Sequence, residues 1–270
     1  MGNAHSDKWI KENVWQHFEE AKNYFPYDNI VGLFLQGSQN YGLATPRSDV
    51  DTKLVVTPTF RQIAFNKQPT SCTHVRANNE HIDFKDLRLY IDTFRKQNIN
   101  FVEILFTPYY ILNATYAGEF MRLIEAREEI AHANPYRAVK AMKGMAMEKF
   151  HAMEHRYPAK VDIVEKYGYD GKQLSHLVRI YDFMQRYIQG DSYMSCLKAR
   201  DPEYLIALKE QGYYSLEAAR EVAEETLQKV IELADGYCAV AVDEFDEKTD
   251  VLMQEVQYNI MERSVRRELK

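Results

Sequence analysis

The stretch LFLQGSQNYGLATPRSDVDTKLVV, residues 33–56, decides the fold, because it places a glycine turn and two aspartates between apolar runs. Residues 29–36 and 49–56 have the apolar and β-branched character of two strands. A carboxylate in a half-buried strand is costly unless something positive lies against it. At this point two explanations are open: Asp49 and Asp51 make ordinary ion pairs, or they hold a metal ion.

Strand geometry favours the metal. Side chains alternate along a strand, so Asp49 and Asp51 are expected on one side and Val50 on the other, towards the core. Two carboxylates that lie this close repel each other, and a divalent cation is the main way to neutralise the pair. Asp83 is a third acid inside an apolar frame, in the alternating run HIDFKD (81–86), and on a neighbouring strand it could bind the same metal. Asp86 is the competing acid, although it fits better as the N-cap of a following helix.

The glycine turn adds a second functional feature. Gly37 allows a sharp turn, and Ser38 follows it with a hydroxyl group and with backbone amides. If SQNYGLA begins a short helix, these amides face an anion, as helix N-termini do for phosphates. The stretch therefore predicts a phosphate site beside a metal-binding acid pair, and phosphoryl or nucleotidyl transfer with one or two magnesium ions needs both.

Composition limits the class of protein. A chain of 270 residues with 46% hydrophobic and 13% aromatic residues can bury a sizeable core, in one large domain or two small ones. The net charge of −6 gives no global basic field, so a polyanion would need a local patch or bridging metal. Three widely spaced cysteines argue against a disulfide framework and predict a reducing, cytoplasmic location. No run approaches the ~20 apolar residues of a membrane span, so no membrane association is expected.

The residue pattern changes about halfway along the chain, from strand-like to helical segments. Residues 6–25 have helical spacing, 80–86 alternate as a third strand, and 57–79 read as a connection with one short helix. Most of the chain after Pro108 reads as helix, and the last stretch, 243–270, is either one more helix or a loose arm. We therefore expect an α/β (α+β) fold, with an α/β domain over 1–112 and an α-helical C-terminal domain over 113–270.

These residues resemble a known family. The order of apolar strand, Gly-Ser, Asp-x-Asp, strand and third acidic strand resembles the DNA polymerase β-like nucleotidyltransferase superfamily. GSQNYGLATPRSDVD (37–51) matches the GSxxYG and SDxD motifs of one branch residue for residue. That branch is described as predicted nucleotidyltransferases, some of them found beside RNA-repair ligases. Three further segments are similar to it, between roughly 30 and 230: 87–106 (with Ile99 where the family has proline), 167–184 and 213–225.

The resemblance implies a palm-like mixed sheet, magnesium (or manganese) and a nucleoside triphosphate. It implies that Gly37 and Ser38 hold the triphosphate tail, that Asp49 and Asp51 bind both metals, and that Asp83 binds the catalytic one. The metal would lower the pKa of an acceptor hydroxyl, which attacks the α-phosphate and expels pyrophosphate.

A second group of candidate residues lies in the helical half. Lys172, His176 and Arg179 repeat at i, i+4 and i+7, so they share one helix face. Such a strip can hold the phosphates of a nucleotide or the backbone of the acceptor. The alternative is a solvated face with His176 against a neighbouring helix. Tyr41 is among the tyrosines that can stack on a base.

Two classes of function follow. The first is a metal-dependent nucleotidyltransferase, whose acceptor is an RNA end (favoured by the resemblance), a protein side chain or a small molecule. The second is a nucleotide-binding sensor or scaffold that keeps the fold without turnover. The intact set of three acids favours catalysis. The sequence predicts neither the preferred base nor the oligomeric state.

Overall fold

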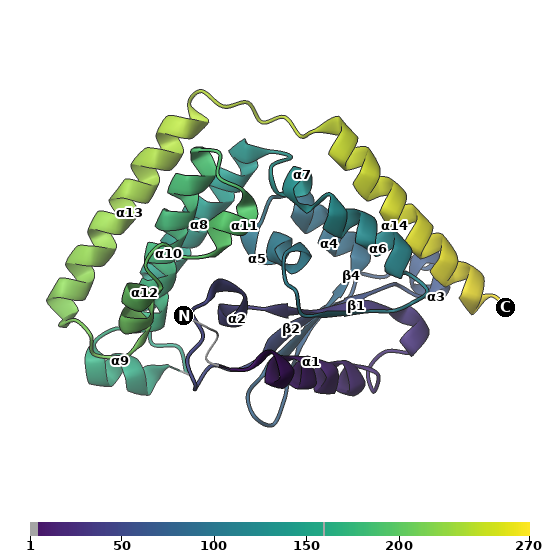
Figure 1. Cartoon of the computed structure of the whole chain (residues 1–270), viewed down its shortest axis with the longest axis horizontal. Coiled ribbons are helices and arrows are strands. Elements are labelled where there is room, and N and C mark those ends of the chain that lie inside the picture. Colours follow the sequence, from purple (N-terminus) through teal and green to yellow (C-terminus); the bar gives the residue numbers. More distant parts are fainter. Residues whose placement is uncertain (1–4, 159) are drawn as a thin grey trace. The chain divides into compact units, whose positions relative to one another are not determined.

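A computed structural model describes residues 5–158 and 160–270, which form two compact units (Figure 1). Unit 1 contains the chain up to Asn40, Ala44–Ala133 and Phe245–Lys270, and unit 2 contains Tyr41–Leu43 and Asn134–Glu244. This division differs from the expected boundary between residues 112 and 113. The helices that follow the sheet in sequence still belong to unit 1, and the chain returns to unit 1 at its end.

Unit 1 is built on a mixed five-stranded sheet, as the sequence predicted. Its strands are β1 (Ile30–Gln36), β2 (Asp51–Val56), β3 (Ser71–Val75), β4 (His81–Asp86) and β5 (Tyr110–Leu112). They are ordered β3-β4-β2-β1-β5; β2 and β4 are parallel, and the other neighbours are antiparallel. The sequence predicted β1, β2 and β4 but not the two edge strands, because β3 is mostly exposed and β5 has only three residues.

The sheet of unit 1 has helices on both faces. In Figure 1, α1 lies along one side of the sheet, and α4 and α6 lie on the other. The C-terminal helix α14 packs against α6 and α4, so the last stretch is a docked helix rather than a loose arm. The α-helical segments that lie wholly or partly in this unit are α1 (Asp7–Ala21), α2 (Ser38–Tyr41), α3 (Phe60–Ala64), α4 (Leu87–Arg95), α5 (Ile99–Val102), α6 (Ala117–Glu125), α7 (Arg127–Ala131) and α14 (Glu247–Glu268), and two short 3-10 turns are η1 (Tyr27–Asn29) and η2 (Glu103–Leu105).

Local signals account for where these helices begin. Ser6 caps α1, since its hydroxyl accepts a hydrogen bond from the Trp9 amide at 3.2 Å. Asp86 caps α4 by accepting one from the Arg88 amide at 2.9 Å. The prediction that Asp86 is a cap is therefore confirmed.

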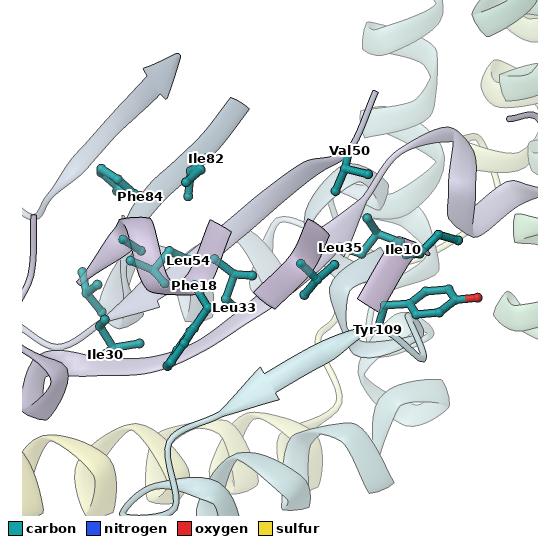
Figure 2. Packing of buried hydrophobic residues seen from close by; sticks show 13 residues of the cluster. Ile10, Phe18, Ile30, Leu33, Leu35, Val50, Leu54, Ile82, Phe84 and Tyr109 are labelled. Atoms are coloured by element: carbon teal, nitrogen blue, oxygen red, sulfur yellow. The ribbon is translucent and has the colours of Figure 1, made fainter. Parts of the chain in front are cut away.

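The core below the sheet explains the orientation of β2. A cluster of buried apolar residues joins α1 to the inner face of the strands, and it includes Ile10, Phe18, Leu33, Val50 and Leu54 (Figure 2). Val50 is fully buried in it, as predicted. Because successive side chains alternate, Asp51 and Lys53 face the opposite side of the sheet from Val50 and Leu54.

Unit 2 is helical. It contains α8 (Pro135–Met153), α9 (Val161–Tyr167), α10 (Gly171–Ile188), α11 (Tyr193–Leu197), α12 (Pro202–Lys209) and α13 (Leu216–Cys238). Helix α10 is its centre, since it packs against α8, α11, α12 and α13. In the described part of the chain, no helix combines the length and apolar character that a bilayer crossing requires.

Candidate functional site

The turn predicted after the first strand is present at the end of β1. Gly37 has a φ of +87°, and Gly42, just after α2, has a φ of +72°. Glycine reaches positive φ without steric cost, which explains why both motif positions carry it. The Gly37 amide donates a hydrogen bond to Oε1 of the buried Glu103 at 3.4 Å. An acidic group therefore already lies at the amide that the resemblance assigns to the triphosphate, and a phosphate oxygen would have to replace it.

Asp49 lies just before β2 and is exposed, so the strand begins two residues later than predicted. The preceding serine of the motif closes a tight turn. The Ser48 hydroxyl accepts a hydrogen bond from the Thr45 amide at 2.8 Å, and the Ser48 amide donates one to the Thr45 carbonyl at 2.9 Å. This turn places Asp49 at the end of the sheet where β2 starts.

The strand register brings Asp51 and Asp83 to one face of the sheet. Asp83 on β4 is paired with Lys53 on the parallel strand β2, and Asp51 is paired with Gln36 on the antiparallel strand β1. Side chains two residues apart share a face, so Asp51 and Lys53 lie on the face that carries Asp83. The expectation that Asp83 lies beside the strand of the acid pair is confirmed.

Both acids are held by hydrogen bonds to neighbouring strands. Asp83 accepts one from the Thr73 hydroxyl at 2.6 Å and one from the Gln36 side-chain amide at 3.2 Å. Asp51 accepts one from the His81 backbone amide at 2.8 Å, and the His81 ring nitrogen lies 3.3 Å from the same oxygen. The two carboxylates are therefore oriented by main-chain and side-chain donors on β1, β3 and β4.

The donor chemistry of this face fits a divalent cation, but the ligands are not yet grouped around one. Carboxylate oxygens are the hard ligands that Mg²⁺ and Mn²⁺ prefer, and Asp49, Asp51 and Asp83 supply them. The buried Tyr90 hydroxyl has no hydrogen-bond partner among the described residues, and burial, followed by the charge of Asp83, raises the pKa of that phenol. Over residues 5–158 and 160–270, however, no three His, Cys, Asp or Glu side chains stand close enough to enclose a metal. A metal held by all three carboxylates would require them to move closer together, whereas Mg²⁺ is often held by one or two carboxylates with water and phosphate.

A lysine pair lies on the same face. Lys53 is buried, donates a hydrogen bond to the Asn100 carbonyl and lies over the Phe101 ring, with its Nζ 4.4 Å from the ring centroid. Lys85 lies over the same ring at 4.3 Å. Burial lowers the pKa of Lys53 to about 7, although the negative charge of Asp83 acts in the opposite direction. The acids thus have cationic side chains as neighbours on their own face.

A buried polar network supports the acid pair from the α1 side of the sheet. Glu80, which is 5% exposed, accepts hydrogen bonds from His17 Nε2 at 2.9 Å and from Arg76 Nη1, and its other oxygen accepts one from the Val50 amide at 3.3 Å. His17 Nδ1 lies 2.9 Å from the Thr52 hydroxyl. Because a carboxylate only accepts, Nε2 carries a proton. In the neutral ring, Nδ1 then accepts from the hydroxyl. Burial lowers the pKa of His17, in agreement with this assignment. The network holds the peptide group between the two aspartates of the motif.

The second set of predicted residues lies in unit 2. Lys172, His176 and Arg179 occur on α10 at the predicted spacing, with Lys172 exposed, His176 half-buried and Arg179 buried. The helix is as predicted, and the binding role of the three residues stays a prediction.

Sequence reasoning missed three residues of the site. Lys53 could have been predicted from the sequence, because it lies two positions after Asp51 and so shares its face of the strand. Glu103 could have been predicted too, because it lies within the segment 87–106 on which the resemblance was partly based. Glu80 could not, since its partners lie on α1 and β2, far away in sequence.

Comparisons with known proteins add little to this geometry. No protein-family model matches the chain, and no curated protein matches it. Among solved structures, the chain is similar to a nucleotidyltransferase-like protein from Exiguobacterium sibiricum, with 11% sequence identity over 84% of this chain and 75% of that chain, and a TM-score of 0.29. This likeness is too weak to assign an activity or a residue role.

Proposed function

We propose that this chain is a metal-dependent nucleotidyltransferase that moves a nucleoside monophosphate from a nucleoside triphosphate to an acceptor hydroxyl, with an RNA end as the favoured acceptor. The proposal depends on one observation: the turn and the acids meet at the same end of the sheet. Gly37 directly follows Gln36, whose partner across the sheet is Asp51, and the parallel pairing of β2 with β4 puts Asp83 on that face. The matching motif residues, 37–51, support the same function.

The roles of the side chains follow from this arrangement. Asp49, Asp51 and Asp83 would hold Mg²⁺ or Mn²⁺, which when bound neutralises phosphate charge and acidifies the acceptor hydroxyl. Gly37 and Ser38 would bind the triphosphate tail in place of the Glu103 carboxylate. A bond forms between the acceptor oxygen and the α-phosphorus, the bond from that phosphorus to the bridging oxygen breaks, and pyrophosphate leaves while the hydroxyl proton passes to water.

Other acceptors and a function without turnover are the alternatives. The same chemistry serves a protein side chain or a small molecule. A nucleotide-binding sensor or scaffold is favoured by one observation: Asp83 is engaged by Thr73 and Gln36, and no group of three ligands is assembled among the described residues.

Transfer of label from α-labelled nucleotides tests the proposal. The purified chain is incubated with α-labelled ATP, CTP, GTP or UTP and Mg²⁺ or Mn²⁺, with RNA or with total cell protein as acceptor. The double variant Asp49→Asn, Asp51→Asn removes the acid pair. Asp92→Asn is the matched control, since Asp92 is an exposed acid on α4 that pairs only weakly with Arg95, at 3.3 Å.

We expect label in RNA with the wild type and with Asp92→Asn, and none with the double variant. Label in protein instead would establish nucleotidyl transfer and replace RNA as the acceptor class. Nucleotide binding without transfer to either acceptor would favour the sensor or scaffold over the enzyme.

A further inference from the structure

Four cationic side chains from three helices of unit 2 gather around one histidine. Lys172 and Arg179 lie one turn before and one turn after His176 on α10, Lys149 belongs to α8, and Lys209 is the last residue of α12. Helix α10 packs against both other helices. The positive charges of all four side chains act on the His176 ring and, after burial, are the next causes that hold its pKa well below the usual range.

The backbone explains why the end of α12 comes so close. A Cβ placed on Gly171, the first residue of α10, would lie 2.3 Å from the Leu208 carbonyl oxygen, so only glycine fits there. The Ser175 hydroxyl, next to His176, donates a hydrogen bond to the Leu205 carbonyl of α12 at 2.8 Å. These contacts fix α12 against the first turns of α10. Lys209, which follows Leu208, is thereby brought to the side of α10 that carries the other cations.

Two acidic groups near these cations have identified partners. Glu148 pairs with its neighbour Lys149 at 2.8 Å, and it is largely exposed. Asp170 caps α10 by accepting a hydrogen bond from the Lys172 amide at 2.9 Å and one from the Gln211 side chain at 3.3 Å. The four cations outnumber these two acids, on a chain whose overall charge is −6. Like charges held together this way are stabilised by a bound anion.

The arginine of this group is held rigidly. The Arg179 guanidinium lies over the Tyr41 ring, with its central carbon 3.8 Å from the ring centroid, and each side chain is only 5% exposed. A stacked guanidinium keeps its N–H edge in a fixed direction, which suits bidentate binding of phosphate. Tyr41 is the tyrosine of the GSxxYG motif and is the last residue of the short helix α2, which starts at Ser38. In this structure the ring packs against arginine, so its predicted role in base stacking competes with this contact.

We propose that Lys149, Lys172, His176, Arg179 and Lys209 form a phosphate-binding site in the helical unit. Lys172 is exposed and Lys149 and Lys209 are partly exposed, so their ammonium groups can reach a ligand, and a neutral His176 still offers one N–H donor. Two ligands carry several adjacent phosphate charges: the triphosphate of a nucleotide and the backbone of single-stranded RNA. Any role of this site in nucleotidyl transfer rests on the proposed function. The binding of phosphate by itself does not.

Binding is measured without turnover, on the full chain in EDTA. The probes are a fluorescent RNA of roughly 12 nucleotides and a fluorescent ATP analogue, each followed by anisotropy over a range of salt concentrations. The test variant is Lys149→Gln, Lys209→Gln, whose two positions no sequence motif indicated. The matched control is Lys8→Gln, Lys11→Gln on α1, and circular dichroism checks that both variants are folded.

We expect the test variant to weaken binding at least about tenfold and the slope of log Kd against log salt to fall by about 1.4 for RNA, since a single-strand phosphate contact contributes about 0.7. The control should leave both unchanged. Binding of RNA alone identifies backbone phosphates as the ligand, binding of the ATP analogue alone identifies the triphosphate, and competition between them identifies one shared site.

Three results would overturn the proposal: no binding of either probe to the wild type at low salt, binding that the test variant leaves intact, or an equal loss in the control. The variant Asp49→Asn, Asp51→Asn separates this site from the proposed activity. It should still bind the probe in EDTA. Failure of nucleotidyl transfer with intact binding would refute only the proposed function.

Discussion

Removal of the Glu80 carboxylate should destabilise unit 1 more than most single substitutions. Glu80→Ala leaves two buried donors and one partly buried donor without their acceptor: the His17 ring, the Val50 amide and one arm of Arg76. A bond to a charged group contributes about 1.5–3 kcal/mol and a neutral one about 1 kcal/mol. Arg76 keeps its second partner, Glu20, at 2.8 Å, which limits the loss. The expected decrease in the free energy of unfolding is therefore about 3–5 kcal/mol, the range found when one partner of a buried pair is removed.

Urea unfolding followed by tryptophan fluorescence measures this decrease. Both tryptophans of the chain, Trp9 and Trp15, lie on α1, the helix that also carries His17. The fluorescence signal therefore reports on the element that packs against the network. Glu80→Gln keeps the volume and one acceptor oxygen, so it should lose less than Glu80→Ala.

Glu12→Ala is the control on the same helix. The Glu12 side chain is 58% exposed and lies 3.7 Å from Lys8, and exposed pairs of this kind contribute only about 0.3–0.5 kcal/mol. If Glu80→Ala cost less than about 1 kcal/mol, or no more than Glu12→Ala, the network would not support the strand as described.

Three further predictions concern pH, backbone space and a buried arginine. Because burial lowers the pKa of His17, the unfolded chain takes up a proton below about pH 6.5 that the folded protein takes up only at lower pH. The contribution of the neutral ring to stability is present at higher pH and should fall as the pH decreases below that value, by at most about 1.4 kcal/mol per pH unit. A His17→Gln variant with the same pH slope of unfolding free energy would contradict this. Gly171→Ala should destabilise the protein by about 1–3 kcal/mol, because the new Cβ would clash with the Leu208 carbonyl oxygen. Gly144→Ala, where a Cβ would meet no neighbouring atom, should stabilise it by about 0.5–1 kcal/mol. Thermal unfolding would refute the reasoning if both changes had the same sign. Arg186→Met should lower the free energy of unfolding in urea by about 2–4 kcal/mol, because the buried guanidinium of Arg186 donates to three main-chain carbonyls around the end of α11. Arg186→Lys should recover less than half of the lost free energy, and full recovery would show that the positive charge alone suffices.

Local patterns predicted most of the central elements of the fold. The alternation in HIDFKD, the capping residues Ser6 and Asp86 and the glycine at position 37 each act over a few residues, and the structure contains the strand, the two helix starts and the turn that they indicate. Edge strand β3 was missed because its exposed, polar residues lack the apolar alternation that marks a half-buried strand. The extent of unit 1 was also missed, because nothing in the residues after 112 tells which helices return to the sheet.

The candidate site shows the same limit. The sequence indicated that Asp83 could contribute if its strand lay beside that of Asp51, and the parallel pairing of β2 with β4 places it there. The motif could not show that Asp83 is engaged by Thr73, since that contact depends on an edge strand the sequence did not reveal. It also could not show that the Gly37 amide is engaged by Glu103, which lies 66 positions further along the chain.

The sequence by itself determined the strands β1, β2 and β4 and the helical second half, and it supplied the residue types on which the proposed metal-dependent phosphate chemistry depends. These follow from periodicity, capping and turn chemistry, which are local properties of the chain. Only the tertiary structure decided which charged groups lie near one another: Lys53 beside Asp83, Glu80 beneath the acid pair, and Lys149 and Lys209 around His176. Charge interactions depend on distance in space and on burial, and residues remote in sequence acquire both only when the chain has folded.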